Sequence, residues 1–156
     1  MTDSVHVRKA EHKDLPTLLE FEQGVIEAER PFDSTLKREA TRYYDIEEMI
    51  SARHVEFLVA EVNGEAVGCG YARIEESKSY LQHRQYAYLG LMYTQPEYRG
   101  KGVNQRIMES LKRWVVKQGV SELRLEVYVQ NELAIKAYEK IGFSKHMFEM
   151  RLGVGK

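Results

Sequence analysis

The segment from Gln95 to Asn104, which reads Gln-Pro-Glu-Tyr-Arg-Gly-Lys-Gly-Val-Asn, limits the fold more than any other stretch of the chain. Before it, residues 86–94 are rich in aromatic and apolar side chains, as a buried strand requires. After it, apolar residues recur at helical spacing from Val103 to Val115. The segment therefore predicts a strand and a helix that are joined by a tight turn.

The turn itself has the composition of an anion-binding loop. A helix N-terminus offers backbone N–H groups without partners, and Gly100 and Gly102 lack the Cβ atoms that would keep a phosphate away from the backbone. Arg99 and Lys101 add formal positive charge. A glycine turn before a helix is also common without any ligand, so a phosphate-binding loop and a simple turn both stay open on these residues alone.

Two common phosphate motifs are excluded. A Walker loop needs Ser or Thr after its Gly-Lys pair, but Gly102 follows Lys101. A dinucleotide-binding fingerprint needs a third glycine at the position of Gln105. If the turn holds a pyrophosphate, it does so as a different kind of site.

The composition indicates one domain without general affinity for polyanions. With 156 residues the chain has the length of an ordinary domain, so we expect a single domain over residues 1–156. Its 23 basic and 24 acidic residues leave a net charge of -1, which does not favour nucleic acid or an anionic membrane as a partner. The chain has no membrane-length apolar run and no secretory signal pattern, so a cytoplasmic protein is expected.

Cysteine and histidine usage predicts neither a disulfide nor a metal site. The one cysteine, Cys69, is expected to be a small buried strand residue rather than a catalytic thiol, because no histidine is near it in the sequence. The histidines show no pair at metal-ligand spacing, so no metal is predicted. They are His6, His12, His54, His83 and His146.

Hydrophobic periodicity and turn residues predict strands and helices in a defined order. Asn63-Gly64 is the strongest hairpin signal. The order predicts an α/β domain with a mixed sheet. The expected strands are residues 5–10, 55–62, 67–74, 86–94, 123–129 and 143–152. The first expected helix begins at Asp14 and is interrupted by Gly24 and Pro31. The others cover residues 34–51, the stretch from Val103 to a stop at Gly119, and residues 131–141.

A second segment, residues 126–143, reads Glu-Val-Tyr-Val-Gln-Asn-Glu-Leu-Ala-Ile-Lys-Ala-Tyr-Glu-Lys-Ile-Gly-Phe. Together with residues 96–102 it resembles the two signature segments of the GNAT superfamily, the acyl-CoA-dependent N-acyltransferases. The resemblance covers the whole chain in element order and is closest over residues 86–145. It implies a GNAT fold, with a mixed, mostly antiparallel sheet of six to seven strands that is splayed in the middle and flanked by about four helices.

The resemblance implies acetyl-CoA as the acyl donor. The backbone of the glycine turn would hold the pyrophosphate, the end of the preceding strand would pair with the pantetheine arm, and two residues of the last helical segment would lie near that arm. The cofactor-binding residues implied in this way are Met92, Tyr93, Thr94, Arg99, Gly100, Lys101, Gly102, Val103, Asn104, Asn131 and Ala134.

Some of these positions have a second explanation or depart from the family pattern. Glu97 stands where many members carry Gln or Arg, and Asn104 replaces a frequent Gly or Ala. Neither change removes a backbone donor, so we expect altered affinity rather than its loss. Gly90 permits the irregularity that a splayed strand needs, or is a packing choice. Asn131 is explained equally well as a helix N-cap.

Tyr138 and Glu126 are the candidate catalytic residues. By periodicity alone Tyr138 would be a core residue, whereas the resemblance makes it the acid that returns a proton to the departing thiolate. A phenol with a reference pKa of about 10 can protonate a thiolate whose conjugate acid has a pKa of about 8.5 in a dry slot. Glu126 has the spacing of the base in enzymes that resemble ribosomal-protein N-terminal alanine acetyltransferases, or is a structural carboxylate. The region before the turn offers only His83, Tyr86 and Tyr88 as a base and contains no carboxylate. A path that carries the proton of the amine through water is therefore the alternative to Glu126.

The expected acceptor is a primary amine on a protein N-terminus, a lysine or a small molecule. Charged residues between the first two helices either border the acceptor site or form a solvated turn. Family members often form homodimers, but nothing in this sequence specifies one. The alternative function is a non-catalytic module that binds acyl-CoA as a sensor. The charged residues are Glu27, Glu29, Arg30 and Asp33.

Overall fold

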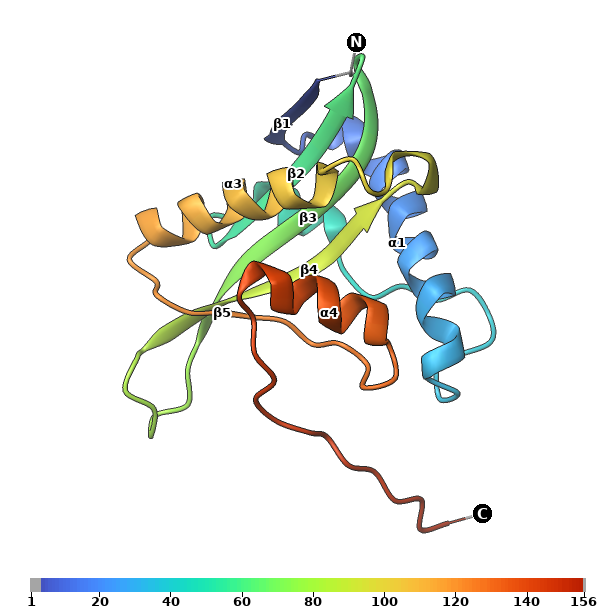
Figure 1. Ribbon diagram of the computed structural model, residues 1–156, viewed down its shortest axis with the longest axis vertical. Coiled ribbons are helices and arrows are strands. Elements are labelled where there is room, and N and C mark those ends of the chain that lie inside the picture. The colour runs from blue at the N-terminus through green and yellow to red at the C-terminus, as the bar shows by residue number, and fades with distance from the viewer. Residues whose placement is uncertain (1–3, 156) are drawn as a thin grey trace. The chain divides into compact units, whose positions relative to one another are not determined.

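The computed structural model describes residues 4–155, and the chain divides into a compact unit that ends at Leu125 and a second that begins at Glu126 (Figure 1). The first unit contains a five-stranded sheet in the order β1-β2-β3-β4-β5. Neighbouring strands are antiparallel except for β4 and β5, which are parallel, so the sheet is mixed as predicted. The strands are β1 (Val5–Lys9), β2 (Val55–Val62), β3 (Glu65–Glu76), β4 (Gln85–Thr94) and β5 (Leu123–Arg124).

The predicted number of strands is wrong, because the described sheet has five and not six to seven. The predicted strand at residues 123–129 is reduced to the two residues of β5, and the predicted strand at Phe143–Leu152 is irregular chain. Residues 123–129 alternate apolar and polar residues, and so do residues 148–152. Alternation indicates which face a strand could bury, but a strand also needs a partner for its backbone groups. In the described chain residues 126–152 pair with no strand.

The predicted hairpin is confirmed. Asn63 and Gly64 join β2 to β3, and both have positive φ, 52° and 79°. Two successive residues in this region form the turn whose twist matches that of the flanking strands.

The second predicted helix is too long. The helices are α1 (Leu15–Glu29), α2 (Ile46–Ser51) and α3 (Val103–Lys117) in the first unit and α4 (Glu132–Ile141) in the second. Short 3-10 turns occur at His12–Asp14, Arg30–Phe32 and Pro96–Tyr98. Helix α2 begins only at Ile46, because the side chain of Asp45 accepts the Glu48 N–H at 3.3 Å. Upstream, Asp33 accepts the Thr35 N–H at 2.9 Å, a local bond that competes with helix formation.

Helices cover both faces of this sheet. Successive strand residues point to opposite faces. Cβ atoms on Gly68 and Gly70 would meet side chains of α3, so α3 covers that face. The opposite face, which carries Cys69 and Tyr71, packs in one apolar cluster with residues of α1 and α2. Figure 1 shows α3 crossing the sheet and α1 running beside β4.

Strand β4 is irregular where it passes β3. Tyr71 pairs with Gly90 while Cys69 pairs with Tyr93, so β4 contains one extra residue at this point, and Leu91 has a φ of 47°. An extra residue of this kind is a β-bulge, which bends the strand. Gly90 itself serves packing, because a Cβ there would lie 2.4 Å from the Tyr71 hydroxyl oxygen.

Candidate active site

The glycine turn, residues 95–104, connects β4 to α3. The Gln95 N–H donates to Val67 O at 2.8 Å, which holds the end of β4 in the sheet. After the 3-10 turn, Gly100 and Gly102 have φ values of 77° and 82°, a region that is costly for residues with a Cβ. No described atom lies within 4 Å of the place that a Cβ would take at either glycine, so the space in front of this backbone is open.

The backbone N–H groups of this turn are available to a ligand. The Arg99 N–H donates to Pro96 O at 3.3 Å, and the next N–H with a backbone acceptor is that of Arg106, which donates to Gly102 O at 3.1 Å. No hydrogen bond between described residues uses the N–H groups of residues 100–105. Such a row of donors at a helix N-terminus attracts an anion.

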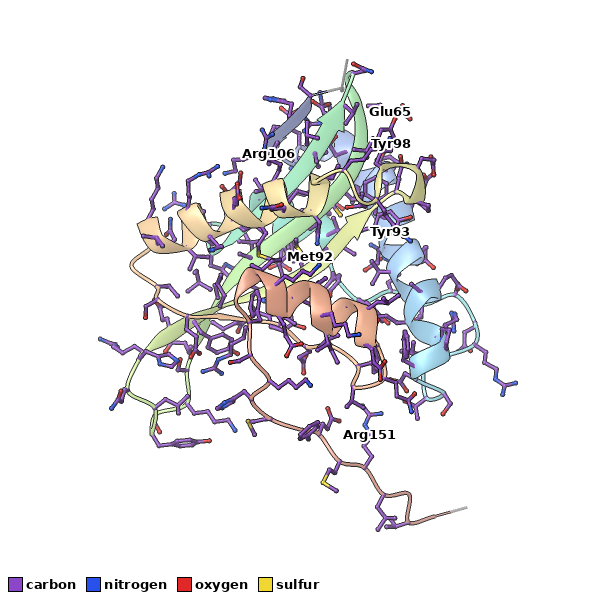
Figure 2. All side chains as sticks on the ribbon, in the orientation of Figure 1. Glu65, Met92, Tyr93, Tyr98, Arg106 and Arg151 are labelled. Atoms are coloured by element: carbon purple, nitrogen blue, oxygen red, sulfur yellow. The ribbon has the colours of Figure 1, made fainter. Side chains whose placement is uncertain are left out.

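Two cationic side chains at the rim lie over aromatic rings. The Arg99 Nε donates to Thr94 O at 3.0 Å, and its guanidinium carbon lies 5.8 Å from the centroid of the Tyr93 ring. The Lys101 Nζ lies 5.5 Å from the centroid of the Tyr98 ring. Figure 2 shows Tyr93 on β4 and Tyr98 in the turn. Charge is therefore held beside the open N–H groups.

A cavity of about 550 Å³ lies beside the turn at the start of α3. Arg106 Nη2 crosses from α3 to donate to Val5 O on β1 at 3.2 Å (Figure 2). At the two ends of the turn, Thr94 Oγ1 and Asn104 Oδ1 are buried without a hydrogen-bond partner in the described chain. Buried polar atoms normally have partners, so both are candidate ligand contacts. The cavity is lined by Ser4, Val5, Lys101, Gly102, Gln105, Arg106 and Glu109.

Strand β4 presents an open edge next to the turn. β5 pairs with only two of its residues, Ala87 and Tyr88, and the backbone beyond them pairs with no described strand on that side. An open strand edge can bind an extended ligand through its main chain. Residues 92–94, which the resemblance to the GNAT superfamily assigns to the pantetheine arm, lie on this edge. The structure thus brings the predicted residues of the strand and of the turn together.

The remaining predicted site residues belong to the second unit. Asn131 is the N-cap of α4, because its side chain accepts the Ala134 N–H at 3.3 Å, so the capping prediction is confirmed. The ring of Tyr138, in α4, lies edge-on to Phe143 at 5.8 Å between centroids. Glu126 opens this unit ahead of α4. The catalytic roles of Tyr138 and Glu126 stay predictions.

The predicted acceptor-side charges are largely engaged with nearby residues. Arg30 pairs with Glu27 at 2.8 Å and donates to Lys37 O at 2.6 Å. Glu29 accepts the Tyr43 hydroxyl at 2.8 Å, and burial raises the pKa of Glu29. These contacts hold the end of α1 to the irregular segment after it.

Sequence reasoning missed Glu22, whose side chain is 0% exposed. It lies on the buried stripe of α1, where Leu18 precedes it by four residues and Ile26 follows it by four. A charged residue at such a position was the signal that could have found it. A fully buried carboxylate needs partners, so this residue points to an internal polar contact.

Cys69 is a buried strand residue, as predicted. It is 0% exposed, its Sγ donates to Leu91 O at 3.3 Å, and burial raises the pKa of its thiol. A thiol of this kind stays protonated and unreactive.

Among residues 4–155, no group of three or more His, Cys, Asp or Glu side chains could hold a metal ion. The same residues include no helix that is long and apolar enough to cross a membrane.

Known structures share this fold. One is a mutant of the BH1408 protein from Bacillus halodurans, at 18% identity and a TM-score of 0.85 over 96% of this chain and 99% of that one. Another is a predicted acetyltransferase with acetyl-CoA from Clostridium acetobutylicum, at 18% identity and 0.72 over 96% of both chains. A third is the aminoglycoside 6'-N-acetyltransferase AAC(6')-IG from Acinetobacter haemolyticus, at 13% identity and 0.73 over 97% of this chain and 99% of that one.

The family is shown by a direct match of the sequence. Residues 22–143 match the model of the acetyltransferase (GNAT) family. The match includes the glycine turn, the open edge of β4 and all of α4. The chain belongs to the acetyltransferase (GNAT) family.

Proposed function

We propose that this protein transfers the acetyl group of acetyl-CoA directly to a primary amine. The observation that carries the proposal is the row of open N–H groups at residues 100–105, which lies beside an unpaired strand edge. The first feature suits a pyrophosphate and the second an extended amide-containing arm. Family membership and the solved acetyl-CoA complex of a protein with the same fold support this donor.

The cavity beside the turn would take the adenosine end of the donor. Lys101 and Arg106 supply positive charge to it, and Glu109 is the one lining carboxylate among residues 4–155. The buried oxygens of Thr94 and Asn104 would gain partners when the donor binds. In this arrangement the departure from the family pattern at Asn104 adds a polar contact to the site.

The amine nitrogen would attack the carbonyl carbon of the thioester, and the carbon–sulfur bond would break. The attacking amine loses a proton and the departing thiolate gains one. We assign the second transfer to the Tyr138 hydroxyl, whose reference pKa of about 10 allows it to donate to a thiolate. The proton that the amine loses goes to Glu126 or to a water relay.

The acceptor could be a protein N-terminus, a lysine or a small-molecule amine. The fold does not choose among them, because relatives with one fold act on different amines. An α-amine with a reference pKa of about 8 needs little help to become neutral, whereas a lysine amine at about 10.4 needs a base.

The test is release of the CoA thiol from acetyl-CoA over a panel of amines. The panel contains a peptide with a free α-amine, a lysine peptide with a blocked N-terminus, spermidine and kanamycin. We expect turnover with at least one of them. Binding of acetyl-CoA without turnover across the panel would instead support the alternative, a non-catalytic acyl-CoA sensor.

A further inference from the structure

Glu22 binds the chain segment that precedes α2. Its Oε2 accepts the backbone N–H of Tyr43 at 3.0 Å and that of Tyr44 at 2.9 Å, and its Oε1 lies 3.5 Å from Arg42 Nε. We name residues 42–45 the anchored segment. Its predicted helix is absent, so without this carboxylate two backbone donors would lose their acceptor.

The anchored segment forms part of an aromatic wall. The ring of Tyr44 lies edge-on to that of Tyr71 at 5.3 Å between centroids, and Tyr71 lies 6.4 Å from Tyr88. The guanidinium carbon of Arg73 lies 5.5 Å from the Tyr71 centroid and 5.6 Å from that of Tyr88. Two strands and the anchored segment thus contribute to one aromatic cluster on the α1 and α2 face of the sheet, in which Tyr44 and Tyr88 are partly exposed and Tyr71 is buried behind them.

This wall lies next to the β-bulge in β4. The hydroxyl of Tyr71 lies against Gly90, and the extra residue of the bulge, Leu91, follows directly. Residues 92–94, to which we assign the pantetheine arm, begin one position later. A strand advances about 3.3 Å per residue, so the wall lies within a few residues of the end of that arm. The acceptor amine would therefore approach over the wall.

A cavity of about 280 Å³ continues from the wall. Tyr43, Tyr44 and Arg73 line it together with the carboxylates of Asp45 and Glu48. Met49, Ala52 and Val55 also line it, so the cavity suits a polar amine whose charged groups are joined by an apolar chain.

We propose that Glu22 is a positioning residue for the acceptor: it holds the anchored segment so that Tyr44 completes the wall against which a polar amine binds. The proposal rests on the acetyl-transfer function given above. Glu22 touches neither substrate. Its removal would displace Tyr44 and the cavity lining, and would leave the glycine turn as it is.

The test compares Glu22→Ala, Glu22→Gln and a control, Glu20→Ala, which removes an exposed carboxylate from the same helix. The assay uses acetyl-CoA and the most active amine of the panel. Glu22→Ala should raise the KM for the amine about tenfold or more and change the KM for acetyl-CoA less than about twofold. Glu22→Gln keeps an oxygen for both N–H groups and should restore most of the amine affinity. Glu20→Ala should behave as wild type.

A second variant covers the case in which Glu22→Ala does not fold. Tyr44→Ala should raise the amine KM by a similar factor and change the KM for acetyl-CoA less than about twofold, because it removes the part of the wall that Glu22 holds in place. A lower turnover number with both KM values unchanged, or a parallel rise of both, would overturn the positioning role alone. Absence of turnover in the wild type over the whole panel would overturn the acetyl-transfer function as well.

Discussion

The glycine turn and the anchored segment differ in whether their backbone N–H groups have hydrogen-bond acceptors within the protein. In the turn, the N–H groups of residues 100–105 have no acceptor among the described residues. In the anchored segment, the N–H groups of Tyr43 and Tyr44 are taken by a carboxylate that is itself 0% exposed. Open donors form a binding site for a ligand, whereas satisfied donors give a rigid support.

The largest effect, on turnover, is expected from a substitution that leaves both the glycine turn and the anchored segment intact. If Tyr138 is the acid, Tyr138→Phe should lower turnover by a factor on the order of 10² to 10⁴, because the thiolate loses its proton donor. Acetyl-CoA affinity should change little, since the open N–H groups remain. Steady-state kinetics with a calorimetric titration measures both quantities. Full activity in this variant would return Tyr138 to a packing role beside Phe143.

A large loss of stability is expected in the anchored segment. Glu22→Ala leaves two backbone donors without an acceptor and should lower the free energy of unfolding by about 3 kcal/mol. Glu22→Gln should cost less, since its amide oxygen can accept both bonds. Urea denaturation gives the values, with an unchanged m-value as the control for a two-state transition. An alanine variant as stable as wild type would mean that water replaces the carboxylate.

The opposite result is expected in the glycine turn, where a substitution should affect binding more than folding. Gly102→Ala places a Cβ in the open space before the N–H groups and should weaken acetyl-CoA binding about 10- to 100-fold through lost charge-assisted hydrogen bonds. Gly119→Ala is a matched control, because Gly119 has a φ of 76° and equally open surroundings at the end of α3. Equal affinities for the two variants would contradict a ligand role for the turn.

The smallest effect on stability is expected at Glu29, which accepts the hydroxyl of Tyr43 in the anchored segment. Burial raises its pKa in the folded protein, so the folded state binds a proton more tightly than the unfolded state. This carboxyl therefore lowers stability as the pH rises from its unfolded pKa through its folded pKa. Glu29→Gln removes that pH dependence and should change stability at neutral pH by less than about 1 kcal/mol. A clear loss of stability would show that the ionised form is needed.

The two segments also differ in how far the sequence predicts them. Gly100 and Gly102 need positive φ and open space, so local composition was enough to locate the turn. The Asn63-Gly64 hairpin was predicted for the same local reason. The anchored segment depends on Glu22, about twenty residues away, and its apolar residues were mistaken for a helix.

The strand count failed for a related reason. Residues 148–152 alternate as a strand does, but pairing depends on a neighbouring strand that alternation does not specify. An irregularity in this strand was one of the two explanations of Gly90, but the extra residue is Leu91, an apolar residue whose positive φ has no local sequence signature. Gly90 makes room for Tyr71, which is the packing role that its sequence context left open.

Amide hydrogen exchange tests the central claim most directly. Without ligand, the amides of residues 100–105 should exchange fast and those of Tyr43 and Tyr44 slowly. With acetyl-CoA at about a hundred times its dissociation constant, exchange at residues 100–105 should slow by a factor on the order of 100, while Tyr43 and Tyr44 stay unchanged. If acetyl-CoA binds and the exchange of residues 100–105 does not slow, these N–H groups do not hold the donor, and the account is wrong.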